Sequence, residues 1–120
     1  AFSGNSIATF NNSVHNNGSH FKMDSGTGQY QRFTAPIAGY YFFSVQMISN
    51  VNTDMFFTLR KNGSVLLGTS TESYNDDGHA SASSHATSYL SASDYVEVYM
   101  TASTASYGGN YANFNGFLIG

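Results

Sequence analysis

The fold of this chain is decided by the stretch Phe33-Thr34-Ala35-Pro36-Ile37-Ala38-Gly39-Tyr40-Tyr41-Phe42-Phe43-Ser44-Val45. It holds the only proline of the chain, and no charged residue follows Arg32 until Asp54. Pro36 and Gly39 predict a turn, and the aromatic and β-branched residues after Gly39 predict a strand. We expect this strand to lie at the centre of the domain.

Side chains alternate between the two faces of a strand, which divides this stretch into two sets. One face carries Tyr41, Phe43, Val45 and Met47. The other face carries Tyr40, Phe42, Ser44 and Gln46. Both sets begin with large aromatic residues, whereas a half-exposed strand is polar on one side. We expect the first set to fill the core and the second to be covered by another layer or another subunit.

Length and composition favour a single extracellular domain over residues 1–120. Charged residues make up only 9% of the chain, against about 25% in a usual soluble domain. The net charge is −3, and the four basic residues are expected to form no stripe, which argues against nucleic acid as a partner. No apolar run is long enough to cross a membrane. The absence of cysteine excludes disulfides and thiolate metal sites.

Short strands separated by turns account for the rest of the chain. Strands are expected at 54–60, 85–90 and 95–100, and Asn62-Gly63 predicts a type I′ hairpin turn. Long polar loops are expected at 49–53, 69–82 and 101–112. No segment shows sustained helical periodicity, so the pattern predicts an all-β, two-sheet jelly-roll sandwich.

Antiparallel strands reverse direction, so alternate connections lie at opposite ends of the sandwich. The three long loops then share one end. The short turns at 34–39, 61–64 and 91–94 share the other end, together with both termini. Loops gathered at one end of a rigid scaffold commonly form binding sites.

Several spaced motifs run in order along the chain. They are Ala1-Phe2-Ser3, the trio Phe10, Asn16 and Phe21, the stretch Phe33–Phe43, Leu59 to Gly63, the set Leu90, Asp94, Val96 and Val98, and the set Phe114, Gly116, Phe117 and Leu118. Together they resemble the globular head domain of complement C1q, in the tumour necrosis factor-like superfamily. The chain departs from that family at three places: a longer stretch between Phe21 and Phe33, Val45 in place of an aromatic residue, and Ser93 in place of glycine.

The resemblance implies a homotrimer, which agrees with the doubled apolar faces. The residues expected at the subunit interface are Tyr40, Phe42, Phe117 and Ile119. Three-fold symmetry would place identical loop clusters side by side and raise the avidity of weak sites.

Tyrosine and asparagine in the long loops suggest a glycan site, because a flat ring can stack on a sugar while amides and carboxylates pair with its hydroxyls. The candidate residues are Tyr74, Asn75, Asp76, His79, Tyr107, Asn110 and Tyr111. The alternative is that Tyr and Asn only keep a weakly charged surface soluble. Lys22 and Arg32 are candidates for meeting the carboxylate of an acidic sugar.

Asp76 and Asp77 are candidate calcium ligands, with Glu72 and Asn75 as co-ligands, although the spacing is not that of an EF-hand. No cofactor is required. His15, His20, His79 and His85 form no metal-binding motif and are expected to be solvated or hydrogen-bonded. No Gly-x-Ser-x-Gly elbow is present, so an enzyme is not expected. Asp94 is expected to cap a turn through its carboxylate.

The sequence thus predicts a secreted, trimeric, lectin-like recognition protein that binds glycans or microbial surfaces through its loop end. The alternative is a structural trimerisation module or a cytokine-like module that binds a protein receptor. The glycosylation candidates, from three Asn-x-Ser sequons, are Asn11, Asn17 and Asn62.

Overall fold

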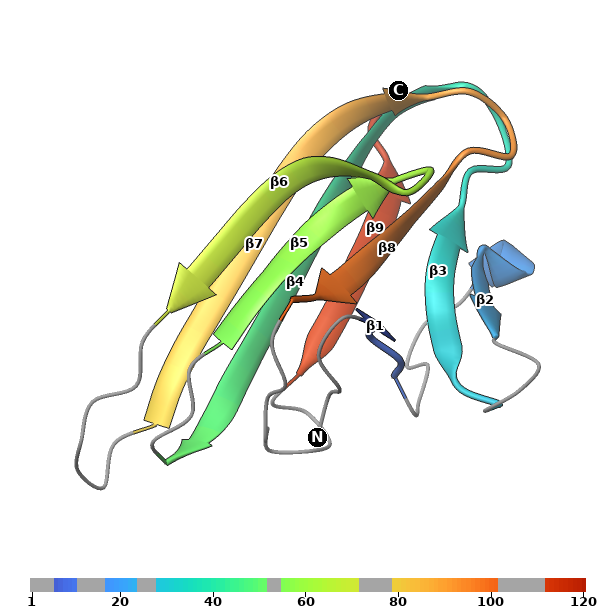
Figure 1. Ribbon diagram of the computed structural model, residues 1–120. Coiled ribbons are helices and arrows are strands. Elements are labelled where there is room, and N and C mark those ends of the chain that lie inside the picture. The colour runs from blue at the N-terminus through green and yellow to red at the C-terminus, as the bar shows by residue number, and fades with distance from the viewer. Residues whose placement is uncertain (1–5, 11–16, 24–27, 52–54, 72–78, 102–111) are drawn as a thin grey trace.

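The computed structural model describes residues 6–10, 17–23, 28–51, 55–71, 79–101 and 112–120. These residues form nine strands and one 3₁₀ turn (Figure 1). In chain order the elements are β1 (Ser6–Ile7), η1 (Asn17–Ser19), β2 (Phe21–Met23), β3 (Tyr30–Thr34), β4 (Gly39–Val51), β5 (Met55–Lys61), β6 (Ser64–Thr71), β7 (His79–Leu90), β8 (Tyr95–Met100) and β9 (Asn113–Leu118).

Two antiparallel sheets lie face to face (Figure 1). The first has the order β2-β3-β8-β5-β6, with β1 paired to β8. The second has the order β7-β4-β9, so the predicted central strand β4 is the middle strand of its sheet. The predicted all-β, two-sheet fold is confirmed.

The core lies between the two sheets and is built from the inward faces of their strands. The four residues expected on the inner face of β4 are at most 1% exposed, and they are Tyr41, Phe43, Val45 and Met47. The opposing sheet contributes Phe57, Leu59, Val96, Val98 and Met100, all fully buried. These exposures confirm the assignment of faces from the sequence. Burying each such side chain contributes about 1.5–3 kcal/mol.

Edge-to-face aromatic contacts join the two sheets through Phe33. Its ring centroid lies 5.5 Å from Tyr41 and 5.3 Å from Phe43 across the sandwich, and 5.2 Å from Phe21 on β2. Gly116 on β9 faces the same cluster, and a Cβ there would lie 2.7 Å from the Phe43 ring. Glycine between Phe114 and Phe117 is therefore needed for this close approach.

Three strands extend beyond the expected boundaries. β4 continues to Val51, β6 to Thr71, and β7 begins at His79. Serine, threonine and alanine give weak strand signals, but β7 pairs with β4 from Gly39↔Leu90 to Val51↔His79. Pairing along the whole of β4 overrides the low local propensity, so the loop expected at 69–82 and the one at 49–53 are both shorter than predicted.

The turn end of the sandwich has the predicted chemistry. Asn62 and Gly63 have φ values of 50° and 85°, as a type I′ hairpin requires. Asp94 accepts hydrogen bonds from the Ser91 amide and from the Asn62 side chain, both at 2.9 Å. These bonds lower the pKa of Asp94 below its usual value. The predicted structural role of Asp94 is confirmed.

The sequence predicts both termini at the turn end, and the structure confirms this for the C-terminus. The C-terminus lies at the turn end, where the Tyr40 amide donates to the Gly120 carbonyl at 3.0 Å. The first described strand, β1, lies at the opposite end, because Ser6 pairs with Met100, the last residue of β8. The prediction of the N-terminal segment at the turn end is therefore wrong for β1.

Candidate functional site

An exposed aromatic face lies on the outer side of the β7-β4-β9 sheet, close to the turn end. Register places Tyr40 opposite Tyr89, and Phe42 opposite Phe117. Tyr40 and Phe117 are each 55% exposed and Ile119, just beyond β9, is 57% exposed. We call Tyr40, Phe42, Tyr89, Phe117 and Ile119 the aromatic face.

Ring contacts join four of the five side chains of the aromatic face. Tyr40 and Tyr89 meet edge to face with centroids 5.4 Å apart, and Phe42 lies 5.3 Å from Phe117. Phe42 also stacks on His85 at 6.3 Å. Three strands thus bring together the predicted interface residues and add Tyr89. Local sequence pattern does not reveal Tyr89 as part of this face, because its position opposite Tyr40 depends on the β4–β7 register.

The same outer surface becomes polar toward the loop end. The residues that continue the rows of the aromatic face are Ser44, Gln46, Ser83, Asn113 and Asn115. The Asn115 amide donates to the Asn113 side-chain oxygen at 3.0 Å. The face is therefore divided into an aromatic half and a hydroxyl- and amide-rich half.

The predicted glycan residues lie almost entirely outside the described residues. Those outside are Tyr74, Asn75, Asp76, Tyr107, Asn110 and Tyr111, together with the calcium candidate Asp77 and the sequon residue Asn11. His79 opens β7, and its backbone pairs with Val51 at the loop end. Among the described residues, no group of three or more His, Asp or Glu side chains could hold a metal ion. The loop-end glycan and calcium sites remain predictions.

The basic residues are arranged differently from the prediction. On the outer face of the first sheet, Lys22 pairs with Arg32, Arg32 with Glu97, and Glu97 with Arg60. Residues directly opposite each other across paired strands project from the same side of the sheet. Three of the four basic residues therefore form a row across β2, β3, β8 and β5, which corrects the expectation that they form no stripe. A stripe that crosses strands is invisible in the sequence because register creates it. We call Lys22, Arg32 and Arg60 the basic row.

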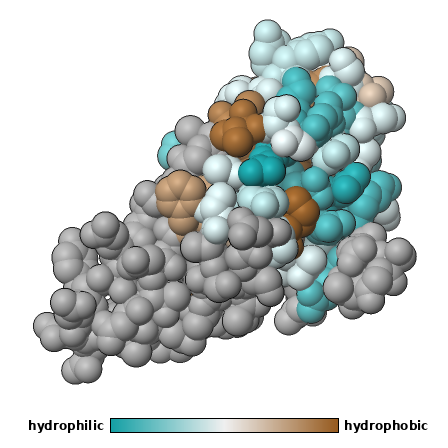
Figure 2. Space-filling model, viewed as in Figure 1, coloured by the Kyte–Doolittle hydropathy of each residue, from teal (hydrophilic) through white to brown (hydrophobic). Residues whose placement is uncertain are grey.

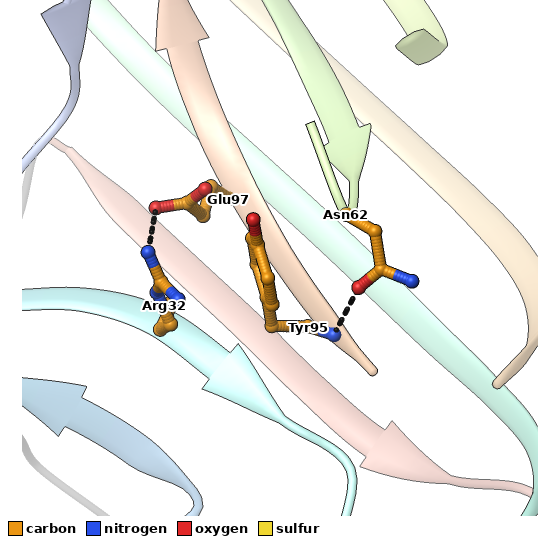
Figure 3. Close-up of polar contacts among 4 residues, drawn as sticks. All are labelled: Arg32, Asn62, Tyr95 and Glu97. Carbon is orange, nitrogen blue, oxygen red and sulfur yellow. Dashed lines mark hydrogen bonds and ion pairs between the residues drawn. The ribbon is translucent and has the colours of Figure 1, made fainter. Parts of the chain in front are cut away.

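Tyrosine rings and a buried carboxylate order the two guanidinium groups of the basic row. The Arg32 guanidinium lies 3.9 Å from the Tyr95 ring centroid, and that of Arg60 lies 3.5 Å from Tyr99. Arg32 Nη2 donates to Glu97 Oε2 at 3.2 Å (Figure 3). Glu97 is only 4% exposed. Desolvation raises the pKa of Glu97, opposed in part by the positive charges of Arg32 and Arg60.

This outer face of the first sheet is mostly hydrophilic over the described residues (Figure 2). Figure 3 shows Arg32 reaching from β3 across to Glu97 on β8, alongside the Tyr95 ring. On the other side of Tyr95, the Asn62 side-chain oxygen accepts a hydrogen bond from the Tyr95 amide at 3.0 Å (Figure 3). Ring, guanidinium and carboxylate are therefore tied to one network that ends at the hairpin.

Two of the glycosylation candidates lie in described backbone. Asn17 begins η1. The Asn62 amide group donates to Asp94 Oδ1 and its oxygen accepts from Tyr95, so both ends of this side chain are used within the fold. In the described part of the chain, no helix is long and apolar enough to span a membrane.

Comparison with known proteins agrees with this arrangement of strands. The family model described as "C1q domain" matches residues 2–119. The chain belongs to the C1q domain family. Chains of solved structures that match this C1q domain include the "Globular Domain of Zebrafish Complement 1qA protein", with a TM-score of 0.75 and 22% identity over 98% of this chain and 86% of that one. No curated protein sequence matches it significantly.

Proposed function

We propose that this C1q domain is a non-enzymatic, secreted recognition module that assembles as a homotrimer and binds glycans of microbial surfaces through its loop end. Membership of the C1q domain family supports a recognition and trimerising role in general. The observation that carries the trimer is the aromatic face. It projects five large side chains from one sheet, and ring contacts join four of them in two pairs.

The energetics of the aromatic face favour a covered state. Fully burying an aromatic side chain contributes about 1.5–3 kcal/mol, and Tyr40, Phe117 and Ile119 each leave more than half of their surface in water. Exposed apolar patches on soluble proteins commonly mark interaction sites. Burial of this face between three copies would offset the entropic cost of association. It would also place three loop ends side by side.

The glycan part of the proposal rests on the loop composition and on the polar half of the same sheet. Tyr107 and Tyr111 would stack on sugar rings, while Asn75, Asp76 and Asn110 would pair with hydroxyls. Asp76 and Asp77 would hold calcium if binding depends on it. Trimerisation would raise the avidity of such sites for a multivalent surface about 10²-fold or more.

The test combines the mass of the protein in solution with a glycan array, read with and without a calcium chelator. We expect a trimer that binds a defined class of sugars. The double substitution Tyr107→Ala/Tyr111→Ala should abolish that binding and leave the protein trimeric. Val65→Ala, an exposed change on β6, serves as the control. A trimer that binds no sugar would overturn the glycan part, and a monomer would overturn the assembly.

A second candidate function follows from the aromatic face alone. A structural trimerisation module, or a cytokine-like module that engages a protein receptor, needs the interface but not a sugar site in the loops. The same array distinguishes the two, because such a module would remain trimeric and ignore glycans.

A further inference from the structure

We propose that the basic row on the outer face of the first sheet binds acidic polysaccharides, through their carboxylate or sulfate groups. This surface uses none of the loop residues of the proposed glycan site, and it is separate from the aromatic face. It uses residues on β2, β3 and β5, whereas the aromatic face belongs to β4, β7 and β9. The inference therefore does not rest on the proposed function.

Charge is the first observation that supports an anionic ligand. The chain carries a net charge of −3, yet three of its four basic residues stand in one row. The single carboxylate in the row, Glu97, is 4% exposed. Its negative charge is therefore buried beside the guanidinium groups, and the surface presented to solvent is positive.

Preorganisation is the second observation. Each guanidinium is stacked on a tyrosine ring, and Arg32 is also bonded to Glu97. Within the described part of the chain, Arg32 donates through Nη2 to Glu97 and Arg60 through Nε to Thr58. A guanidinium has five N–H donors, so most of them remain for a ligand. Side chains already held in place lose less conformational entropy when an anion binds.

The line of the row indicates the shape of the ligand. Neighbouring strands lie about 4.8 Å apart, so the row from β2 to β5 covers about 14 Å at right angles to the strands. An extended chain of acidic sugars carries its negative groups at regular intervals along such a line. Tyr95 and Tyr99 flank the row and offer amphipathic surface to the sugar rings.

Other polyanions fit this surface less well. Duplex nucleic acid is held by proteins through about six to ten phosphate contacts, and anionic membranes by clusters of about four to eight basic residues. The row offers three. We therefore favour a carbohydrate and leave acidic peptides and nucleic acid as outcomes of the test.

The experiment measures binding of the 120-residue chain to polygalacturonate and dextran sulfate, with neutral dextran, polyglutamate and duplex DNA as comparison probes. We expect binding to both acidic polysaccharides that weakens as salt rises, and little binding to the comparison probes. Equal binding to dextran would overturn the role of charge. Equal binding to polyglutamate or DNA would overturn the assignment to carbohydrate.

Two matched variants locate the site. Lys22→Glu reverses a charge within the row, and Lys61→Glu makes the same change on β5 outside it, where Lys61 bonds the Tyr89 carbonyl. Lys22→Glu removes one attractive charge contact and adds one repulsive contact, so we expect it to weaken binding about tenfold. Lys61→Glu should have little effect. An equal loss in both variants would show that only net charge matters and would overturn the site.

A third variant predicts a gain. Glu97→Gln removes the negative charge but keeps an oxygen that can accept the Arg32 hydrogen bond, so binding should strengthen about threefold. If Glu97→Gln weakens binding instead, as general damage to the sheet would, the proposal is overturned. Tyr107→Ala/Tyr111→Ala should leave this binding unchanged, which separates failure here from failure of the loop-end proposal.

Discussion

The outer faces of the two sheets differ in chemistry, because one carries exposed apolar side chains and the other carries paired charges. The aromatic face leaves Tyr40, Phe117 and Ile119 more than half exposed and has no covering layer in the described chain. In the basic row, Arg32 is paired with Glu97 and both guanidinium groups lie over tyrosine rings. One face therefore leaves apolar surface for the proposed assembly to cover, whereas the side chains of the other find their partners within a single chain.

The largest expected effect comes from placing a charge on the aromatic face. Phe117→Asp would bury a carboxylate among aromatic rings in the assembled state, so we expect the trimer to dissociate to monomers, with an avidity loss of about 10²-fold or more for any multivalent ligand. Analytical ultracentrifugation measures the mass. Val65→Asp is the control, because Val65 is 62% exposed but lies on β6, off the aromatic face. A trimer that survives Phe117→Asp would place the interface elsewhere.

The next largest effect is expected from a substitution that breaks the basic row. It should lower the free energy of unfolding and leave assembly unchanged. Arg32→Met keeps the packing on Tyr95 but leaves Glu97 without its ion-pair partner. We expect a loss of about 1–3 kcal/mol in the free energy of unfolding, below the value for a fully buried pair because Arg32 is partly exposed. Urea denaturation measures it.

The double variant Arg32→Met/Glu97→Gln sharpens this result. It removes the uncompensated charge, so it should be more stable than Arg32→Met alone. Lys61→Met, which removes a positive charge outside the row, should cost less than about 1 kcal/mol. If the double variant is no more stable than the single one, burial of the Glu97 charge is not the cause of the loss.

What the sequence could predict depends on whether local pattern or strand register was decisive. The faces of β4, the Asn62-Gly63 turn and the Asp94 cap follow from alternation and turn chemistry, and the structure confirms all three. The basic row and Tyr89 depend on pairing between strands far apart in the chain, so no local pattern revealed them. The extent of β7 was missed because its serines and alanines carry a weak strand signal and are placed by β4.

A moderate effect is expected at the turn end, which both faces share. Asn62 joins the β5–β6 hairpin to Asp94 and to the Tyr95 amide, the residue on which Arg32 stacks. Asn62→Ala should lower the free energy of unfolding by about 1–2 kcal/mol through lost hydrogen bonds and a less favourable left-handed conformation. Thermal unfolding measures it. Ser64→Ala, the next exposed residue after the turn, should change stability little, and equal losses would show a general effect of the hairpin.

The smallest expected effect is a gain in stability from a substitution at Ser93, where the sequence departs from the family's glycine. Ser93 has a φ of 76°, and its amide donates to the Ala35 carbonyl at 2.8 Å. A left-handed conformation costs an L-residue about 1–2 kcal/mol, while glycine costs about 0.5–1 kcal/mol in entropy. Ser93→Gly should therefore stabilise the chain by about 0.5 kcal/mol and raise its Tm by about 2–3 °C. Ser91→Gly is the matched control, because Ser91 does not have a positive φ, and it should lower Tm instead. A fall in Tm for both variants would mean that the Ser93 side chain compensates for its backbone strain.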